Sequence, residues 1–471
     1  MPNRKSIVPC TDVPHTDPHM HSDRSIRVPR RRWRIAWLLG IGVLVNYFDR
    51  VSLSVSQVAL HVSFGIGAVA FGYLSGAYNW TYAMCQLPIG VVLDRWGVRR
   101  TGRVSIFLWS VASFASAISR NLTAFFAARL LLGVGEAPTF PANSKAVGLW
   151  FPPEERSSAT AIFDSAAKFA SAIGVPVLGV VLLSIGWRWS FALTGAISLL
   201  YLLYFWRVYR DPDDDPELTA EERVYIEHRA PVGRVSNQQP AQSVELTQLT
   251  QHAVHKPLPL RLLARQKKVI GLALGFGSYN YVFYLLLTWL PGYLATALHL
   301  DLLHSFLYTG VPWLVATVAE LSIGGWLADF LMCRGANPSR VRQTILVIGM
   351  ACGLGIFGAA GARTPVAALL WISLSIGGLS AAAPIGWSVP ALISPRSSVG
   401  SVGGILNFSN QLSAITAPIL TGYVVAITHS FRWAFGAAAI YLVIGIAAYL
   451  LLLGRIEPMF PESTPLEAAA G

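Results

Sequence analysis

Eight ionisable residues fall inside long apolar stretches of this sequence, where a charged side chain is costly and a functional role is expected by default. They are Asp49, Arg50, Arg129, Glu136, Lys145, Asp164, Lys168 and Glu320. If these stretches are helices that rise about 1.5 Å per residue, most of the eight lie at one depth, roughly 20 Å from one end. Arginines supply fixed cations, and carboxylates beside them can gain or lose a proton. The pattern predicts a proton-coupled site for an organic anion.

The spacing suggests how these charges pair. Arg129 and Glu136 are seven residues apart and share one helix face, so we expect Arg129 to lie near Glu136. We expect Arg50 to act on its neighbour Asp49, so that a substrate held by Arg50 would change how firmly Asp49 keeps a proton.

Structural ion pairs are the alternative to a functional site. This alternative is strongest for Asp164 and Lys168, which are four residues apart on one predicted helix. Glu320 faces either a cavity or a packing partner, and the sequence leaves both open.

The composition places these charges in a membrane protein. Of the 471 residues, 54% are hydrophobic and 13% are charged, against about 25% charged in soluble domains. This excludes a soluble enzyme, a disordered protein and a coiled coil. The net charge of +12 is explained by Lys and Arg at the ends of apolar segments rather than by nucleic-acid binding. The four Cys form no C-x-x-C pair, so we expect no metal and no cofactor.

Twelve segments are long and apolar enough to cross a bilayer as helices. They are 34–56, 67–93, 101–119, 122–150, 157–184, 187–207, 266–292, 302–333, 341–361, 364–392, 398–428 and 431–454. The predicted fold class is therefore an all-α polytopic membrane protein with twelve transmembrane helices in two six-helix halves.

A long polar segment separates six spans from six. The predicted parts are a disordered cytoplasmic N-terminus (1–33), an N-terminal bundle (34–207), a linker (208–265), a C-terminal bundle (266–454) and a tail (455–471). Within the linker, Thr219-x-x-Glu222 is typical of a capping box that opens a short amphipathic helix. The alternation of Arg-rich and Arg-poor loops places both termini in the cytoplasm.

An internal repeat supports two equivalent halves. The motif Gly90-x-x-x-Asp94-Arg95-x-Gly97 follows the second span, and Gly325-x-x-x-Asp329 ends the eighth, 235 residues later. Parallel repeats of this kind occur in transporters whose site lies at midplane between the halves.

The first copy resembles the signature loop of the major facilitator superfamily. In that interpretation Gly90 permits close helix approach. The gate comprises Gly90, Asp94, Arg95, Gly97 and Asp329.

Two further motifs resemble one branch of that superfamily, the anion:cation symporter family. They are Asn46-Tyr47-Phe48-Asp49-Arg50 and the stretch from Arg129 to Pro138, within a resemblance that covers about 33–454. The family includes bacterial galactonate, glucarate and hexuronate symporters and the animal sialin and vesicular glutamate carriers.

The resemblance implies roles for individual residues. Arg50 would grip the substrate carboxylate, and Asp49 and Glu136 would carry protons. Arg129, also counted among the substrate-binding residues, would lie near Glu136 and report or modulate its protonation. The residues that would line a sugar-acid pocket are Tyr47, Tyr82, Trp387 and Asn407. Lys168 departs from the galactonate-type pattern, and as a second cation it would favour a dicarboxylate.

We therefore expect a proton-coupled symporter that takes up a small organic anion, a sugar acid or other carboxylate. We expect a monomer in the inner membrane, with the anion, protons and the bilayer as its partners. No nucleophile–base arrangement predicts an enzyme. Two alternatives stay open: an efflux pump of the same fold, and a transporter-like sensor that binds without transporting.

Overall fold

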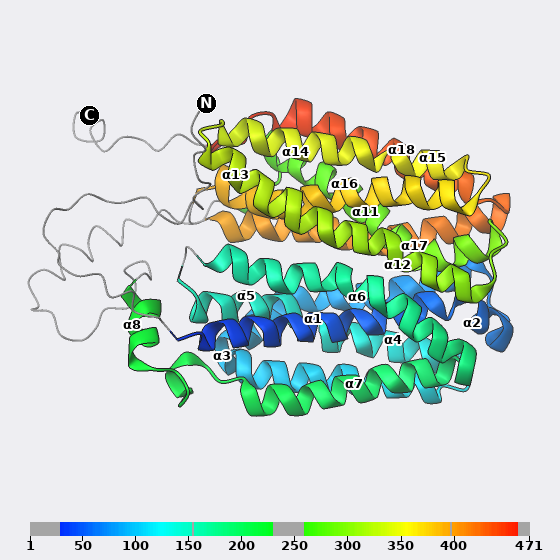
Figure 1. Cartoon of the computed structure of the whole chain (residues 1–471), viewed down its shortest axis with the longest axis horizontal. Helices are drawn as coiled ribbons and strands as arrows, with labels where there is room; N and C mark the ends of the chain where they lie inside the picture. Colours follow the sequence, from blue (N-terminus) through cyan, green and yellow to red (C-terminus); the bar gives the residue numbers. More distant parts are fainter. Residues whose placement is uncertain (1–28, 153–154, 229–258, 396–397, 460–471) are drawn as a thin grey trace, which may run out of the picture.

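A computed structural model describes residues 29–152, 155–228, 259–395 and 398–459. The described residues form helices and connecting loops without a strand. Most helices run parallel to the long axis of the molecule in two side-by-side bundles (Figure 1). The predicted N-terminal disorder over 1–28, and parts of the predicted linker (229–258) and tail (460–471), lie outside the described residues.

The first bundle is built from the N-terminal helices. They are α1 (Arg31–Val55), α2 (Gln57–Phe64), α3 (Ala68–Ile118), α4 (Leu122–Glu136), α5 (Thr139–Trp150), α6 (Arg156–Ile185) and α7 (Trp187–Val208). Three short helices follow: η1 (Pro212–Asp214), α8 (Ala220–His228) and α10 (Leu260–Leu263). Helix α8 begins after Thr219, whose hydroxyl accepts from the N–H of Glu222 as in the capping box of the sequence.

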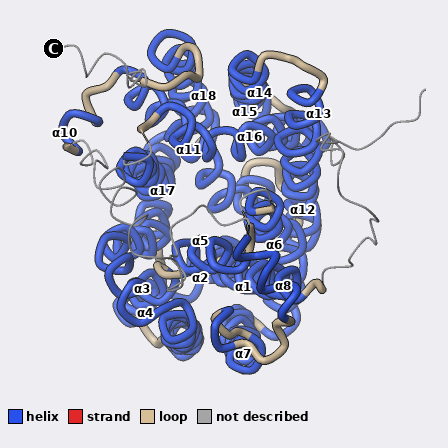
Figure 2. The backbone as a smooth tube through the Cα atoms, turned by 90° about the vertical axis from the view of Figure 1, so that its left-hand side faces the viewer, coloured by secondary structure: helices blue, strands red, loops and turns tan. Residues whose placement is uncertain are grey.

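The second bundle is built from the C-terminal helices. They are α11 (Lys267–Thr296), α12 (Leu302–Ala319), the π-helix η2 (Glu320–Leu327), α13 (Ala328–Cys333), α14 (Pro338–Gly353), α15 (Gly355–Ala360), α16 (Pro365–Ile393), α17 (Val399–Thr428), α18 (Phe431–Ala448) and the π-helix η4 (Tyr449–Leu453). The bundles meet where α6 packs on α12 and α3 packs on α17 (Figure 2).

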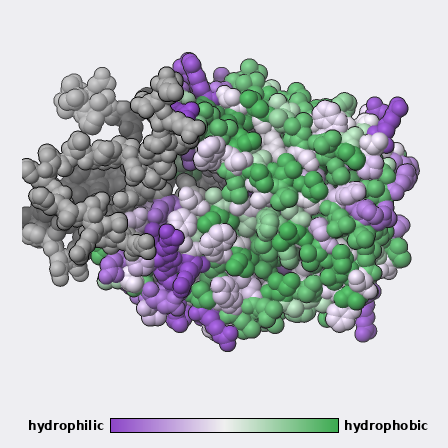
Figure 3. Space-filling model, in the orientation of Figure 1, coloured by the Kyte–Doolittle hydropathy of each residue, from purple (hydrophilic) through white to green (hydrophobic). Residues whose placement is uncertain are grey.

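The helices suit a bilayer. Among the described residues, ten helical stretches are long and apolar enough to cross a membrane, and a bent pair, 57–64 with 68–86, makes an eleventh. Helices α4 and α5 are each shorter than 18 residues and together cover the predicted span 122–150. The face of the molecule drawn in Figure 3 is largely apolar along its middle, with polar residues gathered toward the two ends.

Two details differ from uninterrupted spans. Helix α3 contains two predicted spans joined at Gly97, whose φ of 71° lies in the left-handed region that glycine tolerates. The predicted span 122–150 breaks after Glu136, because Pro138 has no N–H and its ring crowds the preceding turn. Glu136 therefore ends a helix in the middle of the bundle.

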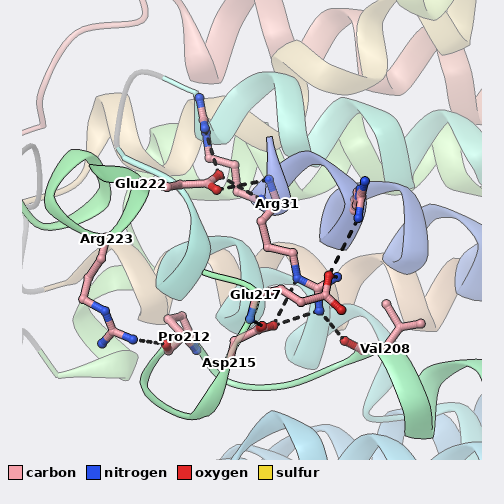
Figure 4. A network of polar contacts seen from close by, with 9 residues as sticks. Arg31, Val208, Pro212, Asp215, Glu217, Glu222 and Arg223 are labelled. Atoms are coloured by element: carbon pink, nitrogen blue, oxygen red, sulfur yellow. Dashed lines mark hydrogen bonds and ion pairs between the residues drawn. The ribbon is translucent and has the colours of Figure 1, made fainter. Parts of the chain in front are cut away.

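The predicted disordered N-terminus is wrong at residues 31–33, where α1 has already begun. The buried carboxylate of Glu222 accepts from the backbone N–H groups of Arg31 and Arg32, each at 3.1 Å. Arg31 also bonds Asp215 and the carbonyl of Val208 (Figure 4). Glu222 of α8, together with Asp215 and Val208 before this helix, thus supplies the acceptors that hold the first turn of α1.

The two bundles are tightly joined near the end of the molecule that carries α2. Across the two bundles the Oγ of Ser54 donates to the carbonyl of Thr288 at 2.9 Å, and within the second bundle the indole of Trp289 donates to the carbonyl of Pro418 at 3.3 Å. A Cβ added at Gly72 would lie 2.6 Å from the same Pro418 carbonyl. Close backbone approach therefore seals this end between the bundles.

Candidate functional site

Arg50 of α1 is the centre of the candidate site. Its Nε lies 3.3 Å from Oε2 of Glu136 on α4, and its guanidinium also donates to the hydroxyl of Tyr78 on α3. The side chain of Arg50 is 7% exposed and that of Glu136 is fully buried. A buried pair of this kind is strongly held only while both partners remain charged.

Aromatic rings fix the guanidinium from several sides. Its central carbon lies 4.4 Å from the ring centre of Tyr47, 4.7 Å from that of Tyr78 and 5.7 Å from that of Tyr82. Ring faces attract a cation, most strongly where water is excluded. The predicted residues Arg50, Tyr47 and Tyr82 are therefore brought together, and the planar fork of the arginine is held in one orientation.

Asp49 occupies a different environment from its neighbour. Its carboxylate lies 2.5 Å from the hydroxyl of Ser113 on α3 and 3.4 Å from that of Ser198 on α7. The expectation that Arg50 acts on Asp49 is not supported, because successive helix residues point about 100° apart. Arg50 faces the boundary between the bundles, whereas Asp49 faces the interior of the first bundle. The partner of Arg50 is Glu136 instead.

Arg129 lies between the backbone of Asp49 and the ring of Tyr78. One of its terminal nitrogens donates to the backbone carbonyl of Asp49 at 3.2 Å, and its guanidinium is 5.9 Å from the ring centre of Tyr78. Arg129 and Glu136 share α4, as predicted, but the ion pair that forms with Glu136 is that of Arg50.

Both arginines line one small cavity between the bundles. Its walls are Arg50, Leu53, Ser54, Ser75, Tyr78, Asn79, Arg129, Tyr284, Leu287 and Thr288. Sequence reasoning missed Tyr78, Asn79 and Tyr284. A signal for Tyr78 was present, since it lies one turn before Tyr82 on the same helix face. Two guanidinium groups among hydroxyl, amide and phenol groups form a surface suited to a carboxylate that also carries hydroxyls.

Lys168 pairs with two carboxylates, Asp164 on its own helix and Glu320 in the other half of the molecule. Its ammonium lies 3.1 Å from Oδ2 of Asp164 on α6 and 3.1 Å from Oε1 of Glu320, where α12 passes into the π-helix η2. The side chains of Lys168 and Glu320 are 5% and 4% exposed. This cation is already paired, whereas Arg129 remains available at the cavity as a second cation.

We predict that Lys168→Gln lowers stability rather than selectivity. Removing the ammonium leaves two carboxylates unpaired, one of them deeply buried, at a cost on the order of 3–5 kcal/mol. The melting temperature of the purified protein should fall, and affinities for a mono- and a dicarboxylate should fall by the same factor. Lys168→Gln/Glu320→Gln should recover part of the loss.

The control for this experiment is Lys268→Gln. That exposed ammonium donates to the carbonyls of Arg455 and Glu457, so little stability should be lost. A selective loss of dicarboxylate affinity at an unchanged melting temperature would instead establish Lys168 as an anion-binding cation.

Trp387 and Asn407 lie apart from the cavity of the two arginines. Trp387 on α16 is 45% exposed and packs edge-on against Phe276 of α11, with ring centres 5.1 Å apart. The amide of Asn407 on α17 lies 3.4 Å from Oε1 of Gln86 on α3. Their predicted place in a sugar-acid pocket stays a prediction.

Four of the five gate residues lie on α3, which turns at the positive φ of Gly97, and the fifth, Asp329, lies on α13 of the second bundle. Arg95 and Asp329 are exposed. The expectation that Gly90 permits close helix approach is wrong, since a Cβ there would meet no atom of the described structure within 4 Å. The side chain of Asp94 lies outside the described part. Among the described residues, no group of three His, Cys, Asp or Glu side chains could hold a metal ion.

The family model and the relatives that match this chain point to the same family of transporters. The model of the Major Facilitator Superfamily matches residues 39–414. An uncharacterized transporter of Bacillus subtilis, YybO, is 35% identical over 440 residues, which cover 93% of this chain and 98% of the relative. A D-galactonate transporter of Escherichia coli O6:H1 is 31% identical, covering 91% and 97%.

The solved structures that resemble this chain share its fold. A D-xylose-proton symporter aligns with a TM-score of 0.69 over 91% of this chain and 99% of its own, at 16% identity. A bacterial homolog of the human lysosomal transporter Spinster, solved inward-facing and unoccupied, has a TM-score of 0.68 at 17% identity and covers 90% and 97%. The predicted twelve-helix fold class is confirmed. The resemblance to the anion:cation symporter family is also confirmed, because the relatives include proteins named as galactonate, galactarate/D-glucarate and hexuronate transporters.

Proposed function

This chain belongs to the Major Facilitator Superfamily of membrane transporters and is not an enzyme, and from that premise we propose that it takes up a small organic anion together with protons. The observation that carries the proposal is the guanidinium of Arg50, fixed by three tyrosine rings at a cavity that Arg129 also lines. A fixed arginine fork recognises a planar carboxylate in two hydrogen bonds.

The substrate class follows from the cavity and from the relatives. Relatives bear the names D-galactonate transporter, probable galactarate/D-glucarate transporter and hexuronate transporter. The hydroxyl and amide groups of Tyr78, Asn79 and Thr288 suit the hydroxyls of such a sugar acid. A second carboxylate, where the substrate has one, would reach Arg129 rather than the already paired Lys168.

Coupling to protons would act through Glu136. The carboxylate of Glu136 forms an ion pair with Arg50, so a substrate carboxylate must compete with it for the same guanidinium. When Glu136 gains a proton it becomes neutral and releases Arg50 to the substrate. Each anion would then bind with a proton. Asp49 would carry a second proton in the interior of the first bundle.

We propose that both termini lie in the cytoplasm, which the positive-inside distribution of Lys and Arg supports, and that the monomer is the working unit. The sealed α2 end would then face outward, and the polar end with α8 would face the cytoplasm.

A binding screen on the purified protein tests the proposal. Sugar acids should raise the melting temperature, with a gain of about 2.7 kcal/mol at a hundred times the dissociation constant. Galactitol, which has the hydroxyls of galactonate without its carboxylate, should not. Stabilisation by organic cations, with none by carboxylates, would overturn the proposal in favour of an efflux pump. Counterflow of a stabilising acid in proteoliposomes then distinguishes a transporter from a sensor.

A further inference from the structure

A polar column runs through the interior of the first bundle, separate from the cavity of Arg50. Three helices contribute one face each, because residues three, four or seven apart line up on a helix. The faces are Leu39, Gly42, Asn46 and Asp49 on α1; Gly102, Ser105, Trp109 and Ser113 on α3; and Thr194, Ser198, Tyr201 and Phe205 on α7. Asp49 is at one end of this column.

The part of the column away from Asp49 contains a cavity. Its volume is about 20 Å³, and roughly 10–15 Å³ suffices for one water. The walls include Gly42, Ser105, Trp109, Tyr201 and, from the break between α4 and α5, Thr139 and Asn143. Val98 and Gly102, next to the Gly97 turn, line it as well. The Gly97 turn lies beside Asp211, in the segment that leads to α8, so the cavity extends from the interior toward that end of the bundle. Helix α8 lies at this end of the molecule (Figure 1).

Several polar atoms at this cavity are buried without a hydrogen-bond partner in the described part of the chain. They are Nε1 of Trp109, Oγ1 of Thr139 and Nδ2 of Asn143. The side-chain Oδ1 and Nδ2 of Asn46, one turn before Asp49, are also buried without a hydrogen-bond partner in the described part of the chain. Leaving so many groups unsatisfied is costly, and native proteins satisfy such groups with internal water. Donors and acceptors converging on one small space are what an ordered water requires.

The column leads to Asp49 through hydroxyl groups. Oγ of Ser113 lies 3.0 Å from the carbonyl of Trp109 and 2.5 Å from Oδ1 of Asp49. On α7, Ser198 approaches the other carboxylate oxygen. The charged group that meets Asp49 from α4 is Arg129, which bonds its backbone carbonyl. Asp49 is fully buried, and the wall of the Arg50 cavity does not include it.

We propose that this column is a water-binding site and that its water carries protons between Asp49 and the α8 end of the molecule. Protons would then leave Asp49 toward the α8 end without passing the substrate. The water site stands on the cavity and the unpartnered atoms alone, whereas the proton route rests on the proposed function.

Radiolytic hydroxyl labelling tests the water site, because radicals formed from bound water modify the side chain beside it. Trp109 should be labelled several-fold faster than Trp289 and Trp313, although all three are at most 2% exposed. Asn143→Leu, which fills the cavity with an apolar side chain, should remove the difference. Trp109 labelled as slowly as Trp289 in the wild-type protein would overturn the water site.

Transport by two variants tests the proton route. Thr139→Val and Asn143→Leu should slow accumulation driven by a proton gradient several-fold and leave counterflow at equal pH unchanged. The matched control is Thr317→Val on α12, whose hydroxyl bonds the carbonyl of Trp313 in its own helix. Gradient-driven uptake at the control rate in both variants would overturn the route. Absence of counterflow in the wild-type protein would contradict the proposed function instead, and the labelling result would stand.

Discussion

Arg50→Lys should abolish concentrative uptake while the protein remains folded. Lysine keeps the positive charge and can still pair with Glu136, so the bundle should assemble. It loses the planar fork that stacks on Tyr47 and Tyr78 and that could hold a carboxylate by two hydrogen bonds. A hydrogen bond to a charged group contributes about 1.5–3 kcal/mol, so binding should weaken about 10- to 100-fold.

The measurement is a thermal-shift titration with the best sugar acid, followed by proteoliposome uptake. Arg188→Lys is the matched control, because Arg188 also lies over an aromatic ring, that of Trp187 at 4.3 Å, but far along α7 from the cavity. Its binding and uptake should equal those of the wild type. Near-normal uptake by Arg50→Lys would remove Arg50 from the substrate site.

Glu136→Gln should bind and exchange substrate but fail to accumulate it against a gradient. Glutamine resembles the protonated carboxyl and is permanently neutral, so Arg50 stays free for the substrate at every pH. The variant should therefore show counterflow at equal pH and no stimulation of uptake by an inward proton gradient. Its affinity for the substrate should depend less on pH than that of the wild type.

Glu136→Asp is the matched variant, because it keeps a titratable carboxylate that is one methylene shorter. It should retain a gradient response, weaker than that of the wild type. Gradient-stimulated accumulation that persists in Glu136→Gln would exclude Glu136 from coupling and leave Asp49 as the proton carrier. That result would also make the polar column around Asp49 the main proton route.

The sequence by itself determined the class of protein and the helices that build it. Long apolar segments with few charges can only be stable as helices in a bilayer, and most predicted spans agree with observed helices within a few residues. Relations within one helix were equally accessible. The pair Asp164–Lys168 follows from the helical period, and so does the shared face of Arg129 and Glu136.

Only the tertiary structure decided which charges meet across helices. Arg50 pairs with Glu136, 86 residues away, and Lys168 pairs with Glu320, 152 residues away. The start of α1 depends on Glu222, about 190 residues further along the chain. The period of a helix fixes which residues share a face, but the rotation of that face toward its neighbours is set by packing over the whole bundle. For this reason adjacent residues such as Asp49 and Arg50 could be placed at the same depth from the sequence, yet their separate surroundings could not.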